Sequence, residues 1–93
     1  MVERRVVIVN RLGLHARAAS QVVRLANQFQ STIKLEREDG SASADAKSIL
    51  SVLMLAAARG TELRATAEGV DEGEALDSLC ELFAKGFGED KQK

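Results

Sequence analysis

Two periodicities of apolar and polar residues divide the chain into strands and helices. Residues 32–36 and 62–68 alternate polar with apolar residues, which is typical of strands that bury one face and expose the other. Residues 5–9 form a short β-branched run and predict a buried strand. The Asp39-Gly40 pair is a hairpin-turn signal, and residues 41–44 after it predict a weak strand.

Three further stretches have the spacing of helices. Apolar residues recur at helical intervals over residues 16–28. An unusually apolar stretch predicts a second helix over residues 48–58, with Gly60 as its C-terminal cap. In the third stretch, Asp71 and Glu74 have the spacing of a capping box. The core stripe of that third helix comprises Leu76, Leu79, Cys80 and Phe83.

Together these elements predict an α+β fold in the order β-α-β-β-α-β-α. The alternating strands indicate an antiparallel sheet with one solvated face, so the helices must cover the other face. We therefore expect an open-faced β-sandwich, with a four-stranded antiparallel sheet covered on one face by three helices. Residues 1–88 form one domain in this prediction, and residues 89–93 form a flexible charged tail.

Composition narrows the functional classes. A net charge of −1 from 13 basic and 14 acidic residues, with 3% aromatic residues, gives no sign of a nucleic-acid-binding surface. No apolar run approaches the roughly 20 residues that span a bilayer, and the first residues lack a signal-peptide pattern. We therefore expect a cytoplasmic protein with no membrane insertion. One histidine and one cysteine exclude structural zinc, and Cys80 is assigned to packing.

The only histidine, His15, stands between a glycine turn at Gly13 and the start of the first predicted helix. The first N–H groups of a helix lack intrahelical partners, and the helix dipole places partial positive charge there, so an anion is stabilised. A neutral imidazole nitrogen can attack phosphorus. Arg17 adds a donor fork that binds phosphate oxygens bidentately. Taken alone, this pattern also fits a polar surface histidine that caps the helix.

The sequence around His15 resembles the active-site signature of the histidine-containing phosphocarrier family, HPr, of the bacterial phosphoenolpyruvate:sugar phosphotransferase system. The segments 47–50 and 67–72 are similar to the second and third landmarks of that family, in the right order, so the resemblance covers nearly the whole chain. The chain departs from the family in having Ala18 where proline is usual and a slightly longer connection over residues 39–45. The matching signature residues are Asn10, Gly13, Leu14, His15, Ala16 and Arg17.

The resemblance implies a phosphoryl carrier rather than an enzyme. It implies that His15 accepts phosphate from enzyme I, through Nδ1, and passes it to the A component of a sugar-specific enzyme II. Arg17 and the backbone N–H groups of Ala16, Arg17 and Ala18 would stabilise the phosphoryl group. No cofactor is expected.

A second expected site is Ser48, at the start of the middle helix. A serine before an apolar run is typically an N-cap worth about 1 kcal/mol. Ser48 also resembles the regulatory serine of the family, which implies an HPr kinase/phosphorylase and a transcriptional regulator as further partners. The resemblance places this helix beside His15 and predicts a docking surface on a monomeric domain, comprising Arg24, Lys47, Ile49, Leu50 and Leu53.

Two alternatives remain open at this point. One is a regulatory paralogue in which the phosphate reports nitrogen or carbon supply without a sugar permease, and the substitution at Ala18 favours keeping it. The other is an interaction module that does not transfer phosphate, against which His15 and Arg17 argue. A stand-alone enzyme has the least support, because the local motif offers no general base for His15 and the chain has no nucleotide-binding loop.

Overall fold

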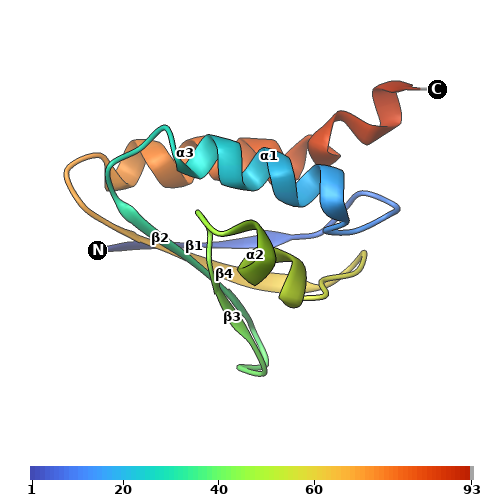
Figure 1. Ribbon diagram of the computed structural model, residues 1–93, viewed down its shortest axis with the longest axis horizontal. Coiled ribbons are helices and arrows are strands. Elements are labelled where there is room, and N and C mark those ends of the chain that lie inside the picture. Colours follow the sequence, from blue (N-terminus) through green and yellow to red (C-terminus); the bar gives the residue numbers. More distant parts are fainter. Residues whose placement is uncertain (93) are drawn as a thin grey trace.

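The computed structural model describes residues 1–92, with side chains described through Glu89. The predicted order of strands and helices is confirmed, and a short 3₁₀ segment, η1, follows the last helix (Figure 1). The elements are β1 (Val2–Val7), α1 (Ala16–Ala26), β2 (Thr32–Arg37), β3 (Ser43–Asp45), α2 (Ile49–Met54), β4 (Glu62–Glu68), α3 (Glu72–Ala84) and η1 (Gly86–Gln92).

The four strands form one antiparallel sheet in the order β1-β4-β2-β3. β4 is central, and its inward residues Leu63, Ala65 and Ala67 are buried while the residues between them are more exposed. On β2, Ile33 and Leu35 pair with this buried face of β4. The alternation read from the sequence therefore corresponds to one packed face and one solvated face, as predicted.

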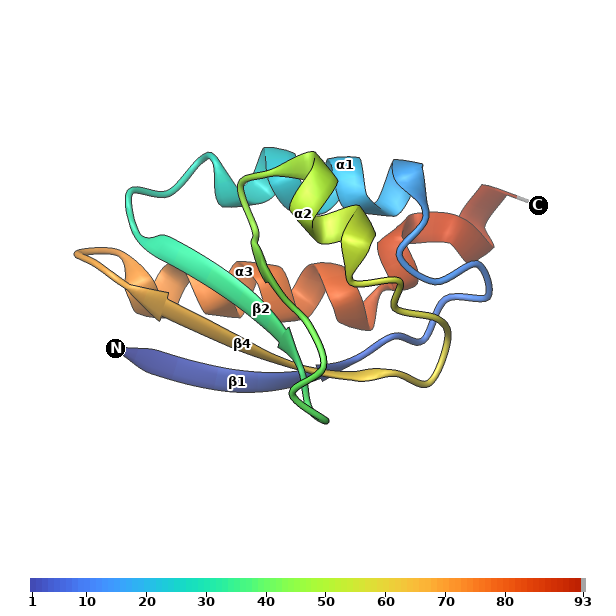
Figure 2. The same cartoon turned by 60° about the horizontal axis from the view of Figure 1, so that its bottom comes forward.

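All three helices lie on the same face of the sheet (Figures 1 and 2). α1 and α3 run side by side along it, and α2 packs near α1 and β3. The core between the layers is mostly aliphatic, with Phe83 and Phe87 as its buried aromatic residues. Its fully buried large apolar side chains are Ile8, Val22, Ile33, Leu35, Val52, Leu55, Leu63, Leu76, Leu79 and Phe83.

Three predicted boundaries shift by a few residues. β1 begins at Val2 rather than at residue 5 and ends at Val7, because the full length of its ladder pairs with β4 from Val2↔Ala67 to Val7↔Glu62. α1 ends at Ala26, where the Asn27 side chain donates to the Val23 carbonyl. The weak strand after the hairpin begins at residue 43 instead of 41.

The middle helix is shorter than predicted, and Gly60 is not its cap. α2 ends at Met54, because the Leu55 and Ala56 N–H groups donate to carbonyls only three residues back, on Val52 and Leu53, and Ala56 then has a φ of 50°. The Arg37 guanidinium donates to the Leu55 carbonyl at 2.9 Å, and the Leu14 N–H donates to the Ala57 carbonyl at 2.9 Å. The carbonyl groups that follow this turn are therefore satisfied by other parts of the chain.

The predicted capping box of α3 is also wrong. Asp71 is the N-cap residue, but its carboxylate accepts no hydrogen bond from the helix. It accepts instead from the Gln30 and Ser31 N–H groups and from the Ser31 hydroxyl, which ties the turn before β2 to the start of α3. The N-terminal turn is closed by Glu72, whose carboxylate accepts from the Gly69 N–H. These bonds lower the pKa of Asp71, the Ser31 hydroxyl contributing most.

The chain changes direction sharply after α3. Gly86, Phe87 and Gly88 have φ angles of 62°, 59° and 72°, a left-handed conformation that glycine adopts freely and phenylalanine rarely. Phe87 is buried, with its ring in edge-to-face contact with Phe83 at 5.1 Å between centroids. This turn brings Glu89 back toward the N-terminus of α1, where it contacts Asn10 and His15. The division at residue 88 into a domain and a flexible tail remains a prediction, although Glu89 itself makes the contacts described below.

Candidate functional site

His15 is the N-cap of α1. Its backbone is extended, with φ −73° and ψ 179°, and its Nδ1 accepts a hydrogen bond from the Arg17 N–H at 3.3 Å. The side chain is 29% exposed, so one part of the ring reaches solvent while the rest is packed. The capping role expected of a polar residue at this position is therefore present, and it places a ring nitrogen at the positive end of the helix.

The helix end beside His15 is suited to an anion. The N–H groups of Ala16, Arg17 and Ala18 precede the first intrahelical hydrogen bond, which Ala19 donates to the His15 carbonyl at 2.8 Å. The first turn contains no acidic residue. The methyl group of Ala18 is fully buried in the core. Alanine at this position therefore fits the helix start, where it keeps an N–H group that proline would lack.

The loop before α1 is held by two residues of the predicted signature. Gly13 has φ +68°, and a Cβ there would lie 2.6 Å from the Ala57 carbonyl oxygen, so only glycine allows the loop to lie this close to the segment after α2. Asn10 is 1% exposed, and its Nδ2 donates to the Gly13 carbonyl at 2.8 Å. These contacts fix the path of the backbone into His15.

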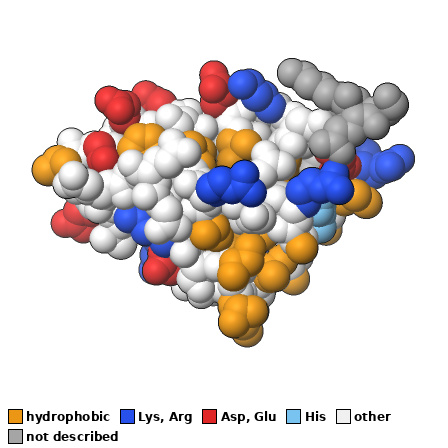
Figure 3. Space-filling model, turned by 45° about the horizontal axis from the view of Figure 1, so that its top comes forward, with side chains coloured by type: hydrophobic (Ala, Val, Ile, Leu, Met, Phe, Trp, Pro, Cys, Tyr) orange, Lys and Arg blue, Asp and Glu red, His pale blue; other side chains and the backbone are white. Residues whose placement is uncertain are grey.

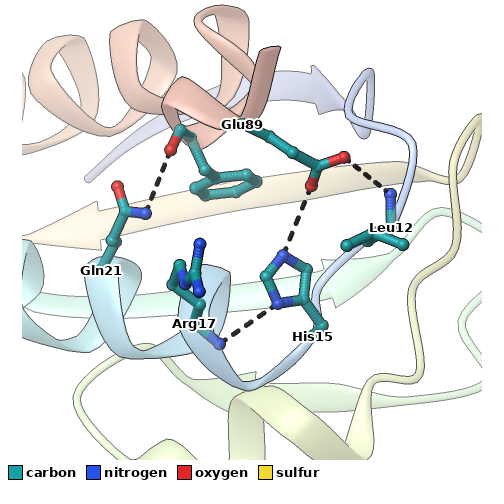
Figure 4. A pocket seen from close by; sticks show the side chains of 6 residues that line it. Leu12, His15, Arg17, Gln21 and Glu89 are labelled. Atoms are coloured by element: carbon teal, nitrogen blue, oxygen red, sulfur yellow. Dashed lines mark hydrogen bonds and ion pairs between the residues drawn. The ribbon is translucent and has the colours of Figure 1, made fainter. Parts of the chain in front are cut away.

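Glu89 joins the site from the opposite end of the sequence. One carboxylate oxygen lies 3.4 Å from His15 Nε2 and also accepts from Asn10 Nδ2 at 2.9 Å. The other accepts from the Leu12 N–H at 3.2 Å (Figure 4). The hydrogen bond from Asn10 contributes most to lowering the pKa of Glu89, with smaller contributions from Leu12 and His15. The carboxylate is therefore favoured in its ionised form.

A small cavity of about 210 Å³ opens beside the ring. Figure 4 shows His15 between the N-terminus of α1 and Glu89, with Gln21 on the next turn of α1 and its amide donating to the Phe87 carbonyl at 3.1 Å. The residues that line the cavity are Leu12, His15, Arg17, Gln21, Phe87 and Glu89. Four of these, Leu12, Gln21, Phe87 and Glu89, were not among the residues predicted for the site. The Gly-Phe-Gly triplet was the one local signal of a turn that could return the chain.

Ser48 is the N-cap of α2, as expected. Its hydroxyl accepts from the Ser51 N–H at 3.4 Å, and its side chain is half-buried. Cys80 is also half-buried, packed against the core, and burial raises the pKa of its thiol.

The residues predicted for docking fall into two groups. Ile49 and Leu50 are 40% and 70% exposed, while Leu53 is half-buried against the core. Arg24 is exposed, beside the groove between α1 and α3. Lys47 is half-buried and its ammonium donates to the Phe29 carbonyl at 2.9 Å, so its charge is already engaged near the end of α1.

An apolar surface lies next to the histidine. Figure 3 shows hydrophobic side chains gathered on one part of the surface, with lysine or arginine side chains and the pale blue histidine at its margin. Its exposed members from the loop before α1 and from α2 are Leu12, Ile49, Leu50 and Met54, of which Met54 was not predicted. We call these four residues the apolar patch.

An open-faced sandwich of one four-stranded antiparallel sheet and three helices is the fold of the small phosphocarrier proteins. The chain belongs to the HPr family: the family model described as "PTS HPr component phosphorylation site" matches residues 2–85. It is 46% identical over 87 residues to the phosphocarrier protein NPr of Proteus mirabilis, covering 94% of this chain and 96% of that protein. It is 45% identical over 89 residues to the phosphocarrier protein HPr of Cupriavidus necator, covering 96% and 98% of the two chains.

The fold is similar to solved structures of the same family. The crystal structure of HPr-C-His from Thermoanaerobacter tengcongensis has a TM-score of 0.88 and 38% identity, covering 95% of this chain and 97% of that one. Family membership supports a phosphocarrier role in the phosphotransferase system. Within residues 1–92, no helix is long and apolar enough to cross a membrane, and no group of three or more histidine, cysteine or acidic side chains is arranged to hold a metal ion.

Proposed function

We propose that this protein carries a phosphoryl group between enzyme I and the A component of a sugar-specific enzyme II, with His15 as the acceptor. The observation that carries the proposal is the position of the His15 ring at the N-terminus of α1, with Nδ1 turned toward the Arg17 N–H. N–H donors of the first helical turn, a positive helix end and a guanidinium are the groups that stabilise a phosphoryl anion.

The transfer proposed is an exchange between two histidines. The Nδ1 lone pair of His15 forms a bond to phosphorus while the bond between phosphorus and the donor's ring nitrogen breaks, and the electron pair of that bond returns to the donor ring. The phosphoryl oxygens would accept from the N–H groups of residues 16–18 and from Arg17. Reversible carriage needs moderate stabilisation, because tight binding would trap the group.

The apolar patch supports a docking role for this face. An exposed apolar surface rimmed by cations suits a partner that presents apolar and acidic side chains. We propose that enzyme I and the A component dock in turn here, in the cytoplasm, on a monomeric carrier. Ile49, Leu50 and Leu53 would make the apolar contact. Arg24 and Lys47 would add positive charge to this side of the domain, Lys47 while its ammonium also donates to the Phe29 carbonyl.

The direct test is incubation of the purified protein with phosphoenolpyruvate and enzyme I, followed by mass spectrometry under non-acidic conditions. We expect one acid-labile phosphate on His15, onward transfer to an A component, and no label on His15→Ala. Arg17→Ala should keep the acceptor but lower the rate by roughly tenfold or more, since a charged hydrogen bond to the phosphoryl group is lost. Absence of label with the cognate donor would instead favour an interaction module without transfer.

A second candidate is supported by one comparison. Identity to the Proteus mirabilis NPr is about the same as to the Cupriavidus necator HPr, at 46% and 45%. In this reading the chemistry at His15 is unchanged, but the phosphate state reports nitrogen or carbon supply and no sugar permease follows. Onward transfer measured side by side to a sugar-specific A component and to one without a permease would separate the two.

A further inference from the structure

The contact between Glu89 and His15 is built by several parts of the structure. Glu89 is 16% exposed in its side chain, and both carboxylate oxygens are engaged, one by Asn10 Nδ2 and His15 Nε2 and the other by the Leu12 N–H. Asn10 is itself buried and holds the loop through Gly13. A carboxylate fixed from two sides is unlike a surface ion pair between flexible side chains.

The backbone leading to Glu89 is also held in place by contacts with the rest of the domain. Three successive left-handed residues, including the buried Phe87, turn the chain after α3, and Gln21 of α1 donates to the Phe87 carbonyl. A phenylalanine in this conformation is locally unfavourable, so the surrounding contacts must hold it. The placement of Glu89 is therefore a property of the packed domain.

Two contacts at opposite sides of the imidazole favour the same tautomer. The Arg17 N–H donates to Nδ1, which must then carry a lone pair. A Glu89 carboxylate oxygen faces Nε2 at 3.4 Å, where it favours a proton on that nitrogen (Figure 4). A neutral ring satisfies both contacts only when it is protonated at Nε2.

We propose that Glu89 is a positioning residue for His15: its carboxylate holds the proton on Nε2, so that Nδ1 at the helix N-terminus is the nucleophilic nitrogen. This inference rests on the proposed phosphoryl transfer to His15. When Nδ1 bonds to phosphorus and the donor's N–P bond breaks, the ring keeps its Nε2 proton and gains a positive charge. The Glu89 carboxylate faces that charge, and no proton has to leave during the step.

The geometry also sets Glu89 apart from Arg17. Arg17 extends from the first turn of α1, where it is exposed, and can reach phosphoryl oxygens near Nδ1. Glu89 approaches the other edge of the ring, so its negative charge is placed away from the incoming phosphoryl group. In this proposal the Arg17 guanidinium stabilises the phosphoryl oxygens, while the Glu89 carboxylate interacts with the Nε2 proton.

The test compares Glu89→Gln and Glu89→Ala with Glu81→Gln, which removes an exposed carboxylate of α3. ¹⁵N spectra of the imidazole in the unphosphorylated protein, at a pH where the ring is neutral, report which nitrogen carries the proton. We expect the Nε2-protonated form in the parent, in the control and largely in Glu89→Gln, whose amide oxygen can still accept. Glu89→Ala should show a mixture of tautomers.

Phosphorylation by enzyme I gives the second measurement. We expect the rate to fall by about ten- to a hundredfold in Glu89→Ala, the size of the loss of a charge-assisted hydrogen bond, and by less in Glu89→Gln. A merely structural role would lower thermal stability and leave the tautomer unchanged, and that result would overturn the proposal. Unchanged spectra and rates would overturn it too. If the parent protein takes no phosphate at all, the proposed function fails, while the ¹⁵N spectra still decide the role of Glu89.

Discussion

Gly13 is the residue at which the loop before α1 tolerates least change. Its φ of +68° is unfavourable for other residues, and an added Cβ would lie 2.6 Å from a backbone oxygen that cannot rotate away. The same oxygen, on Ala57, accepts the Leu14 N–H. A side chain at Gly13 therefore disturbs both the loop and the segment after α2.

We expect Gly13→Ala to lower the free energy of unfolding by about 2–4 kcal/mol, from backbone strain of about 1 kcal/mol plus a steric clash. Gly40→Ala is the matched control, since Gly40 has a similar φ of +76° but no atom within 4 Å of the added Cβ. That control should lose only the strain. Urea unfolding of both variants measures the difference, and equal losses would contradict the steric explanation.

The sequence predicts some residues of the site and misses others. His15 and Arg17 stand in one short segment, so turn chemistry and helix spacing were enough to bring them together. Glu89 lies 79 residues from Asn10, and nothing in local spacing indicates that the two side chains meet. Its position depends on the left-handed turn at Phe87, a conformation that the residue type does not suggest.

At the scale of elements, α2 combines an N-terminal cap with exposed apolar side chains. Ser48 closes the helix start, and Ile49, Leu50 and Met54 lie exposed on the turns that follow. The predicted helix ran four residues too far at its C-terminal end, because periodicity cannot show that the chain leaves the helical conformation at Ala56, whose φ is 50°. The capping box at Asp71 failed for a similar reason, since its carboxylate serves the turn before β2.

We propose that phosphorylation of Ser48 weakens docking of the donor without unfolding the domain. A phosphate adds roughly −1.5 to −2 charges beside the apolar patch, where an acidic partner would be repelled. Ser48→Asp keeps a side chain that can cap the helix, so its melting temperature should change little while phosphorylation of His15 by enzyme I slows. Ser41→Asp, at the exposed β2–β3 turn, controls for charge. Unchanged docking in Ser48→Asp would show the electrostatic explanation to be wrong.

At the scale of the whole molecule, stability should depend on three carboxylates that hold separate segments together. Hydrogen bonds lower the pKa values of Asp71, Glu72 and Glu89 in the folded state. The folded protein then binds protons less readily than the unfolded chain, so stability is full above the ordinary values of 3.8 and 4.5 and falls as pH drops below them.

Asp71→Asn should test this dependence. We expect the variant to be less stable than the parent at neutral pH and to lose less stability between about pH 5 and pH 2, because only the other carboxylates with a lowered pKa, such as Glu72, Glu89 and Asp39, then contribute to the slope. Chemical unfolding across that range measures both effects. Glu74→Gln, at an exposed position of the same helix turn, removes one negative charge as the control. Parallel curves for the parent and Asp71→Asn would refute the role of Asp71.

The overall architecture could be predicted from the sequence. Each element buries one face, and this produces the alternation in β2 and β4 and the helical spacing in α1 and α3. The central place of β4, between β1 and β2, was not predicted. Strand neighbours depend on long-range pairing, for which local periodicity carries no information.

The meeting of residues 10–17 with Glu89 has a consequence for how the molecule becomes active. A loop spanning most of the chain must close before that carboxylate reaches the imidazole, and such closures are among the slow steps of folding. A partly folded chain can form α1 and its capped terminus while its ring still samples both tautomers. The His15 ring would then adopt its reactive tautomer only when the fold is complete. The ¹⁵N spectrum of this side chain, followed during refolding, would report when the last long-range contact forms.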